Sequence, residues 1–252
     1  MTTNIVLSHF AVAIYNDQLH AKPHSHQYVQ INLLKDKAHV TGNNQAYVAP
    51  CVIINANINH GVASEGAVIT LLLDQFSQVG KALTHRLQYM SQFEQGIATF
   101  HSLDTSLLWR YFESQQDKGL FQPAFSNLLT QLKCACPITF HEPDSRITEV
   151  IKLLTQNKFA HQPFSELAKK VHLSPSRLSH LFSEQLGLPF KSYLRYCRFR
   201  NVIKHLNEGK NLTDAAYASG FSDSAHLSRE CKSLFGINAK SLKAQLSLIE
   251  VT

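Results

Sequence analysis

One sequence pattern occurs twice in the C-terminal half of the chain, between residues 164 and 242. The first copy contains Leu167-Ala168, Leu173-Ser174 and Leu178-Ser179 and closes at Gly187, and the second contains Ala215-Ala216, Phe221-Ser222 and Leu227-Ser228 and closes at Gly236. The two copies are offset by 48 residues at the start and 49 at the end. Apolar positions, capping residues and closing glycines therefore recur together, which indicates a duplicated structural unit.

Each copy predicts a short helix, a tight turn and a second helix. Ser165 and Ser174 are the expected caps in the first copy, with Pro175 at the first position of its second helix. Thr213 and Ser222 are the expected caps in the second copy. A glycine with positive φ is a common helix terminator, which suits the two closing glycines. This is the helix-turn-helix arrangement, whose second helix can enter a DNA major groove.

Residues 190–207, between the two copies, have helical periodicity and contain neither Gly nor Pro. A helix of this length is about 27 Å long. Successive major grooves on one DNA face are about 34 Å apart. A linker helix here could therefore hold two recognition helices near the spacing of one DNA turn.

The stretch from Phe164 to Leu242 resembles the DNA-binding domain of the AraC/XylS family of transcriptional regulators. The strongest likeness is Gly220-Phe221-Ser222-Asp223-Ser224-Ala225-His226-Leu227-Ser228-Arg229, continuing to Phe235-Gly236. The sequence departs from the usual family pattern at two places. The pattern has Phe where this chain has Cys231, and it has Pro shortly after the closing glycine, where this chain has Asn238-Ala239. The resemblance implies sequence-specific binding of double-stranded DNA, usually as an activator in contact with RNA polymerase.

The DNA contacts are expected on the second helix of each unit and beside it. We expect base contacts from the residues opposite the buried leucines, namely Ser176, Ser179, His180, Ser224, Ala225, His226 and Arg229. We expect phosphate contacts from capping and basic residues, namely Ser174, Arg177, Lys191, Arg195 and Ser222.

The basic charge is concentrated on the same half of the chain. Residues 144–252 contain 16 Lys and Arg against nine Asp and Glu, whereas residues 1–143 contain eight against nine. Positive charge that coincides with the repeated motif is what phosphate binding requires. Five cysteines without disulfide spacing, no secretory signal and no apolar run of about 20 residues favour a cytoplasmic protein outside the membrane.

The first 75 residues predict many short strands. Apolar runs at 10–15, 28–34, 46–48, 51–54 and 68–73 are separated by turn-forming residues, which favours a sandwich or small barrel. This part is similar to the cupin-like effector domain that precedes many AraC-type DNA-binding domains. The residues that carry the similarity are His24-Ser25-His26-Gln27 and Asn59-His60-Gly61-Val62.

One predicted strand alternates Tyr28, Gln30 and Asn32 with apolar residues, so one of its faces is polar. This face either lines a cavity or lies in solvent. We expect a small-molecule effector to bind the polar residues of this region, namely His24, His26, Tyr28, Gln30, Asn32 and His60. The three histidines could also bind a metal, but no carboxylate follows the pair. We therefore expect neither metal nor other cofactor, and no enzyme activity.

Residues 76–133 show helical spacing of apolar residues, which favours packing on the sheet and allows a homodimer face. Cys134 and Cys136 could form a metal or redox pair, although chance placement is the simpler interpretation. Pro137 and Pro143 mark a linker.

The predicted fold class is multidomain α+β. A cupin-like domain at 1–136, with strands in 1–75 and helices in 76–134, is followed by a linker at 137–144 and an all-α domain at 145–252 with helix-turn-helix units at 164–187 and 212–236. Three functions fit this organisation. They are an effector-responsive transcriptional regulator, a metal-dependent cupin enzyme fused to a DNA-binding module, and a constitutive DNA-binding dimer without effector.

Overall fold

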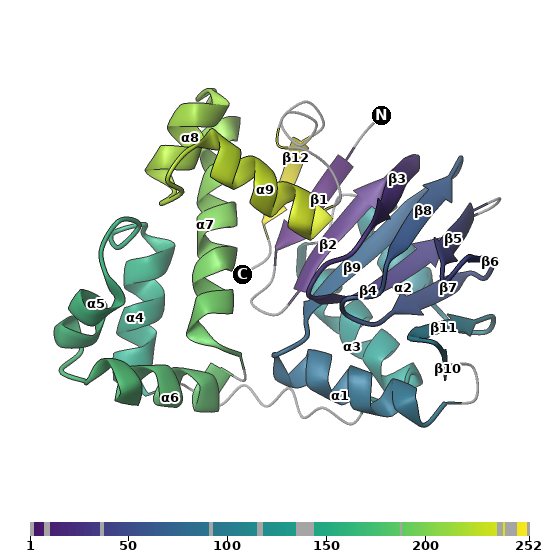
Figure 1. Ribbon diagram of the computed structural model, residues 1–252, viewed down its shortest axis with the longest axis horizontal. Helices are drawn as coiled ribbons and strands as arrows, with labels where there is room; N and C mark the ends of the chain where they lie inside the picture. Colours follow the sequence, from purple (N-terminus) through teal and green to yellow (C-terminus); the bar gives the residue numbers. More distant parts are fainter. Residues whose placement is uncertain are drawn as a thin grey trace.

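The computed structural model describes residues 3–7, 11–35, 38–90, 93–114, 118–134, 144–186, 188–235, 239 and 246–250. Strands dominate the first half and helices the second, as predicted, and the two halves lie side by side (Figure 1). The expected linker, Gly187 and Gly236 lie outside the described residues, apart from Asp144 at the linker's end.

The N-terminal half is built on a large and a small sheet. The large sheet has eight strands in the order β10-β11-β7-β4-β9-β2-β1-β12, and the small sheet has four in the order β3-β8-β5-β6. The strands are β1 Thr3–Leu7, β2 Ala11–Asn16, β3 Leu19–His24, β4 Tyr28–Leu34, β5 Ala38–Gly42, β6 Gln45–Tyr47, β7 Cys51–Ile54, β8 His60–Ser64, β9 Val68–Asp74, β10 Phe93–Glu94, β11 Ile97–Phe100 and β12 Leu246–Glu250. Neighbouring strands are antiparallel except β1 and β12, which are parallel.

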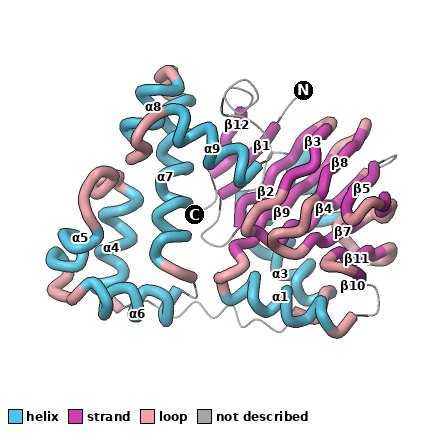
Figure 2. The backbone as a smooth tube through the Cα atoms, viewed as in Figure 1, coloured by secondary structure: helices cyan, strands magenta, loops and turns pink. Residues whose placement is uncertain are grey.

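One face of the large sheet packs against three helices, α1 Gln78–Gln88, α2 Ser106–Ser114 and α3 Phe121–Gln131, with a short 3-10 helix at Lys118–Leu120 before α3. Figure 2 shows α1 below the strands and α3 behind them. The apolar residues Val29, Ile31 and Leu33 of β4 lie in this core together with Leu83 and Phe125. The apolar stripes of residues 76–133 therefore form internal core, and a dimer face on these helices stays a prediction.

Two different parts of the protein pack against the opposite face of the large sheet. Leu34 and Ile54 pack against Val40 and Val62 of the small sheet. Ile14, Tyr28 and Leu72 instead share a core cluster with Phe199 and Val202 from the C-terminal half. The large sheet therefore contributes directly to the interface between the two halves of the chain.

The described part of the C-terminal half contains strand β12 and six helices, α4 Ser145–Thr155, α5 Phe164–Lys170, α6 Pro175–Leu186, α7 Phe190–Asn207, α8 Leu212–Ala218 and α9 Ser224–Phe235. Helix α7 has the bounds that the sequence predicts. It separates the α5–α6 pair from the α8–α9 pair (Figure 1). Its aromatic residues join both cores, because Tyr193 packs with Phe182 of α6 and Phe199 packs on Phe221 before α9. No helix in the described part is long and apolar enough for a bilayer crossing.

Several local predictions are wrong. Helix α5 begins at Phe164 after Pro163, so Ser165 lies inside the first turn and does not cap it. Asn211, not Thr213, caps α8 by accepting a hydrogen bond from the Asp214 backbone at 2.9 Å. Strands β10 and β11 fall in the region predicted to be helical, and β12 in the half predicted to be all helical.

Candidate nucleic-acid interface and candidate ligand site

The first helix-turn-helix unit is held by its turn and its cap. His172 has a φ of 54° in the turn between α5 and α6. The Leu173 backbone N–H donates to Ala168 O at 3.0 Å, and Ser174 Oγ accepts from the Arg177 N–H at 3.2 Å. The expected cap at Ser174 is therefore confirmed, with Pro175 as the first residue of α6. These contacts fix where α6 starts and which of its faces is exposed.

The face of α6 opposite its buried residues is polar. Leu178, Leu181 and Phe182 point into the core. The α6 residues predicted to meet DNA, namely Ser176, Arg177, Ser179 and His180, are all exposed, as are Pro175, Glu184 and Gln185. This face carries short hydroxyl groups, one guanidinium and one imidazole, a set that can donate to and accept from base edges and phosphates.

The second unit has the same form with a different cap. Asp223 Oδ1 accepts from the His226 N–H at 2.6 Å, so Asp223 takes the capping role that was expected of Ser222. Ser222 Oγ instead lies 3.1 Å from His226 Nδ1, and the His226 ring packs edge-on against Phe221. This arrangement holds the imidazole of His226 toward the start of α9.

The exposed residues of α9 include Ala225 and Arg229, whereas Ser224 and His226 are half-buried and Leu227 is buried. Of the predicted base contacts in this unit, Arg229 and Ala225 thus have the freest approach to a partner. All seven predicted base contacts lie on α6 or α9, and their contact with DNA stays a prediction.

A half-buried amide network, not foreseen from the sequence, joins the end of α4 to α7 and α8. Asn157, after the end of α4, has a φ of 58°. Its Nδ2 donates to Ala218 O in α8 at 2.6 Å, and its Oδ1 accepts from Asn201 Nδ2 in α7 at 2.9 Å. A lone Asn after a helix with a second Asn inside another helix is too weak a sequence signal to reveal this contact.

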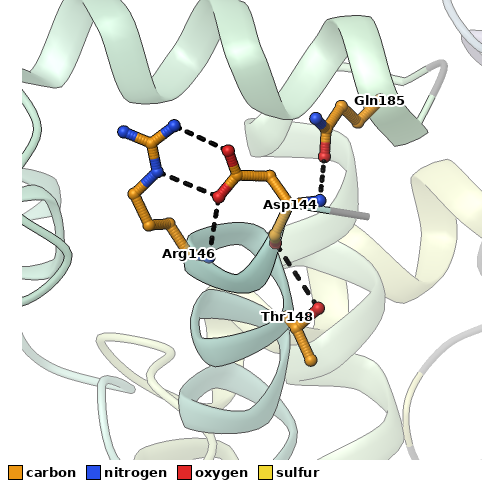
Figure 3. Close-up of polar contacts among 4 residues, drawn as sticks. All are labelled: Asp144, Arg146, Thr148 and Gln185. Carbon is orange, nitrogen blue, oxygen red and sulfur yellow. Dashed lines mark hydrogen bonds and ion pairs between the residues drawn. The ribbon is translucent and has the colours of Figure 1, made fainter. Parts of the chain in front are cut away.

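A fork of hydrogen bonds fixes the start of α4 (Figure 3). Asp144 accepts from the Arg146 backbone N–H and Nε, both at 2.9 Å, and from Arg146 Nη2 at 2.6 Å. The Asp144 N–H donates to Gln185 Oε1 of α6 at 2.7 Å. Asp144 therefore caps α4, and it also anchors this helix to the first recognition helix.

The predicted basic phosphate contacts have different surroundings. Lys191 at the start of α7 is exposed. Arg195, one turn later, is half-buried and already paired, because Nη1 donates to Tyr28 Oη at 3.1 Å and Nε lies 3.3 Å from Glu230 Oε2 on α9. A phosphate contact by Arg195 would require it to leave these partners, and that contact stays a prediction.

The polar face of β4 points inward, which decides between the two orientations left open by the sequence. Tyr28, Gln30 and Asn32 are all buried. His26 and His60 are also buried and His24 is half-buried, and the three imidazole rings lie with centroids 4.7–5.4 Å apart. All six predicted effector residues thus lie in one region, and we call His24, His26 and His60 the three-histidine cluster.

Gln30 is the centre of the hydrogen-bond network in this region. Its Oε1 lies 2.8 Å from His26 Nε2 and 3.1 Å from His60 Nε2. Its Nε2 donates to Asn32 Oδ1 at 2.8 Å, and Thr70 Oγ1 donates to the same oxygen at 3.2 Å. The buried Asn32 Nδ2 has no hydrogen-bond partner among the described residues. A buried donor without a partner is costly, so this group suits contact with a ligand oxygen.

Burial governs protonation in this region. It lowers the pKa of His60 to about 3 and also lowers the pKa of His26, so both rings are neutral near pH 7. It raises the pKa of Tyr28 to about 12, so the hydroxyl stays protonated while it accepts from Arg195. Neutral imidazoles are the form that binds metals.

A pocket of about 580 Å³ opens next to His60. Its lining combines polar side chains with small apolar residues and contains no Asp, Glu, Lys or Arg; it consists of Pro23, Thr41, Gly42, Asn43, Asn44, Gln45, Ala46, Asn59 and His60. The sequence did not identify residues 41–46 as part of a ligand site, because turn-forming residues such as Gly42 and Asn43 indicate only a connection between strands. Their asparagines and glutamine offer both donors and acceptors to a small molecule.

Only one of the two cysteines considered as a metal or redox pair lies within the described residues. Cys134 is buried, and Cys136 lies outside the described residues. Cys51, Cys197 and Cys231 are also buried thiols, and burial raises the pKa of each. Buried thiols with raised pKa values are poor nucleophiles.

Comparison with known proteins identifies the C-terminal half. The family described as "Helix-turn-helix domain" matches residues 167–245. The chain is 23% identical over 221 residues to the uncharacterized HTH-type transcriptional regulator YbfI of Bacillus subtilis, covering 81% of this chain and 80% of that protein. It is 27% identical over 148 residues to the arabinose operon regulatory protein of Salmonella typhimurium, covering 56% of this chain and 53% of that protein.

Among solved structures, ToxT from Vibrio cholerae with an unsaturated fatty acid bound matches 96% of this chain and 97% of its own, at 15% identity and a TM-score of 0.47. The matched helix-turn-helix domain and the regulators found by sequence agree with the paired units described above. Residues 167–245 therefore contain a helix-turn-helix domain, and the chain is similar to transcriptional regulators of the AraC type.

Proposed function

We propose that this regulator binds double-stranded DNA with α6 and α9 in two successive major grooves, and that a small molecule bound in the N-terminal half adjusts this binding. The observation that carries the first part is the pair of recognition helices joined by α7. Both helices bury one leucine-containing face and expose the opposite polar face. Two such faces at the ends of a rigid connector suit a duplex, because its major grooves recur at about 34 Å.

We propose that Arg229 provides most of the base discrimination. Its side chain is exposed on α9 next to Ala225. A guanidinium can bind guanine O6 and N7 with two hydrogen bonds, worth about 1–3 kcal/mol of discrimination. The α6 face carries Ser176, Ser179 and His180, whose hydroxyl and imidazole groups accept several base edges. The second unit is therefore the more selective of the two.

We propose that the effector binds between the three-histidine cluster and the adjoining pocket. The support is the inward row Tyr28, Gln30 and Asn32, the unpartnered Asn32 Nδ2, and the polar lining at residues 41–46. These groups favour a small molecule rich in hydrogen-bonding oxygens. Because β4 also contacts the C-terminal half through Tyr28, a ligand here would lie close to the interface between the halves.

The remaining parts of the proposal follow the family. We infer a cytoplasmic activator that contacts RNA polymerase, pairs as a homodimer and has no enzyme activity. We also retain the division into an effector domain at 1–136, a linker at 137–144 and a DNA-binding domain at 145–252. Dimer formation would double the number of DNA contacts and raise affinity through linkage of the sites.

Selection from a random duplex library with the full chain at low salt tests the proposal. We expect enrichment of one sequence with two short elements, and tight binding of the purified fragment. Failure to enrich any sequence, or equal binding of the enriched and scrambled fragments, would contradict sequence-specific binding. Thermal shifts with a panel of small oxygen-rich molecules then test the effector part, because a ligand of the native state raises Tm.

A further inference from the structure

We propose that the three-histidine cluster binds one divalent transition-metal ion, and that binding alters the contact between Tyr28 and the DNA-binding half. The second part rests on the proposed function, since it makes this ion, alone or with a small ligand bound to it, the effector. The first part is independent of DNA binding. The cluster lies in the N-terminal half, where His24 ends β3, His26 lies between β3 and β4, and His60 begins β8.

The candidate ligand atoms converge. One nitrogen from each of His24, His26 and His60 lies within 4.8 Å of the others. Two ligand nitrogens of a tetrahedral zinc ion are about 3.4 Å apart at metal–nitrogen distances of about 2.1 Å. Rotation of the rings that brings the nitrogens closer by about 1 Å therefore lets all three bind one ion.

Two of the three rings are already oriented as metal ligands. His24 Nδ1 lies 2.9 Å from Lys22 O, and His60 Nδ1 lies 2.9 Å from Ile58 O. A carbonyl only accepts, so each Nδ1 carries the proton and each Nε2 has a free lone pair. Metal-binding histidines usually have this arrangement, in which the second ring nitrogen donates to a backbone carbonyl.

The Gln30 side chain supplies a further candidate ligand atom to the cluster. The amide direction is set because Nε2 donates to Asn32 Oδ1, which leaves Oε1 facing the histidines. Gln30 Oε1 and the unprotonated His60 Nε2 then face each other at 3.1 Å as two acceptors. A positive ion near both atoms would turn this unfavourable contact into two bonds. Gln30 Oε1 is thus placed as a fourth ligand.

The ligand types define the class of ion. Imidazole nitrogens suit zinc, nickel, cobalt and copper, whereas calcium and magnesium prefer several oxygens. The cluster contributes three imidazoles and one amide oxygen, and no carboxylate belongs to it among the described residues. The ion would keep its full charge and an open side near the pocket beside His60, where a small anion could bind it.

His26 connects the cluster to the interface between the halves. Its Nδ1 accepts from the Tyr28 backbone N–H at 3.3 Å, so its ring proton is on Nε2, which donates to Gln30. His26 can bind a cation through Nε2 only if this proton is lost and Nδ1 becomes the protonated atom. Two N–H groups, of His26 and of Tyr28, would then face each other, and one of them must move.

Tyr28 is connected to the second recognition helix through two successive contacts, so a movement of Tyr28 changes the surroundings of that helix. The Tyr28 hydroxyl accepts from Arg195 at 3.1 Å, and Arg195 pairs with Glu230 of α9 at 3.3 Å. The tyrosine ring also belongs to the apolar cluster shared with Phe199 and Leu227. A shift of the Tyr28 backbone therefore changes the support of α9 without any direct contact between the metal and the DNA-binding half.

Calorimetric titration of the chelator-treated full chain with zinc, and visible absorption with cobalt, test the first part. We expect one ion per chain. The His24→Gln variant should bind at least tenfold more weakly, while His20→Gln, which alters an exposed histidine paired with Glu65 at 3.3 Å, should bind as the wild type does. No binding, or equal loss in both variants, would overturn the site. His24 is half-buried, so the variant is expected to fold, and circular dichroism checks this.

Hydrogen exchange without DNA tests the second part. We expect zinc to change amide exchange in α7 and α9 of the wild type at least threefold, and to change it clearly less in Tyr28→Phe, which still binds zinc but lacks the bond to Arg195. Exchange that is unaffected in the wild type, or equally affected in both proteins, would overturn the coupling. Because neither measurement uses DNA, these outcomes are distinguishable from a failure of DNA binding.

Discussion

Arg195 Nη1 lies 3.1 Å from Tyr28 Oη, and this hydrogen bond joins the linker helix α7 to strand β4 of the effector half. The same guanidinium contacts Glu230 of α9 at 3.3 Å. The pair lies beside the apolar cluster in which Ile14 and Leu72 meet Phe199 and Val202. The second recognition helix is therefore supported by the effector half as well as by its own domain.

Removal of the Tyr28 hydroxyl should destabilise this interface. In Tyr28→Phe the ring remains and only the bond to Arg195 is lost, so we expect a decrease of about 1–2 kcal/mol in the free energy of unfolding, as for a hydrogen bond to a charged group. Urea denaturation measures this change. Tyr47→Phe is the control, because Tyr47 accepts an exposed hydrogen bond from Gln45 at 2.7 Å and should cost much less. Equal effects of the two substitutions would show that the interdomain contact contributes nothing particular.

We expect replacement of Gly220 by a residue with a side chain to destabilise the protein, because the added atoms would clash with neighbouring backbone. It has a φ of 87°, and an added Cβ would lie 2.4 Å from the Ala160 backbone oxygen. Gly209 has a φ of 88° and nothing within 4 Å of that position, so it is a matched control for the conformational part. We expect Gly209→Ala to cost about 1 kcal/mol and Gly220→Ala at least 1–3 kcal/mol more. Thermal denaturation of both variants measures the difference, and similar Tm values would refute the predicted clash.

Asp144 should make stability depend on acid pH. Hydrogen bonds from the side chain and then the backbone of Arg146 lower the pKa of this carboxyl from 3.8 to about 2. Its ionised form thus favours the native state above pH 4, and this contribution is lost as the pH falls toward 2. Asp144→Asn retains a capping side chain without the charge. We expect its Tm to be lower than that of the wild type at pH 6 and the difference to shrink by pH 2; a constant difference would contradict this.

Arg229 and Lys191 should affect DNA binding in different ways. Both are exposed, Arg229 on α9 and Lys191 at the start of α7. Arg229→Ala should remove about 1–3 kcal/mol of preference for the selected site over scrambled DNA. Lys191→Ala should weaken binding to both DNAs equally and lower the salt dependence by about one counterion. Fluorescence anisotropy at several salt concentrations separates the two. Uniform loss with Arg229→Ala would identify it as a phosphate contact.

The helical half is the part that the sequence predicts best. Its signals are local, since Leu178 and Leu227 with their neighbouring serines mark buried faces and helix starts within one or two turns. Residues 190–207 also show helix periodicity over their full length, and α7 has these bounds. The capping errors at Ser165, Thr213 and Ser222 arise because several polar residues lie near each helix start, and the turn geometry decides which one is used.

The sequence identified residues of the ligand region, but not how they are arranged in space. Alternation identified the polar row on β4, yet whether it faces the interior depends on the packing of the small sheet and of α7. The pairing of Arg195 with Tyr28 joins residues 167 positions apart, which no local pattern specifies. Short strands such as β3 and β8 contain histidines and few apolar residues, so they gave no clear strand signal.

Chemical footprinting of the selected DNA with the full chain tests the central claim most directly, namely that α6 and α9 bind two successive major grooves. Methylation protection reports guanine N7 in the major groove. We predict two protected patches centred about 10 base pairs apart on one face of the duplex, as the length of α7 requires. A single patch, or two patches on opposite faces, would contradict the account.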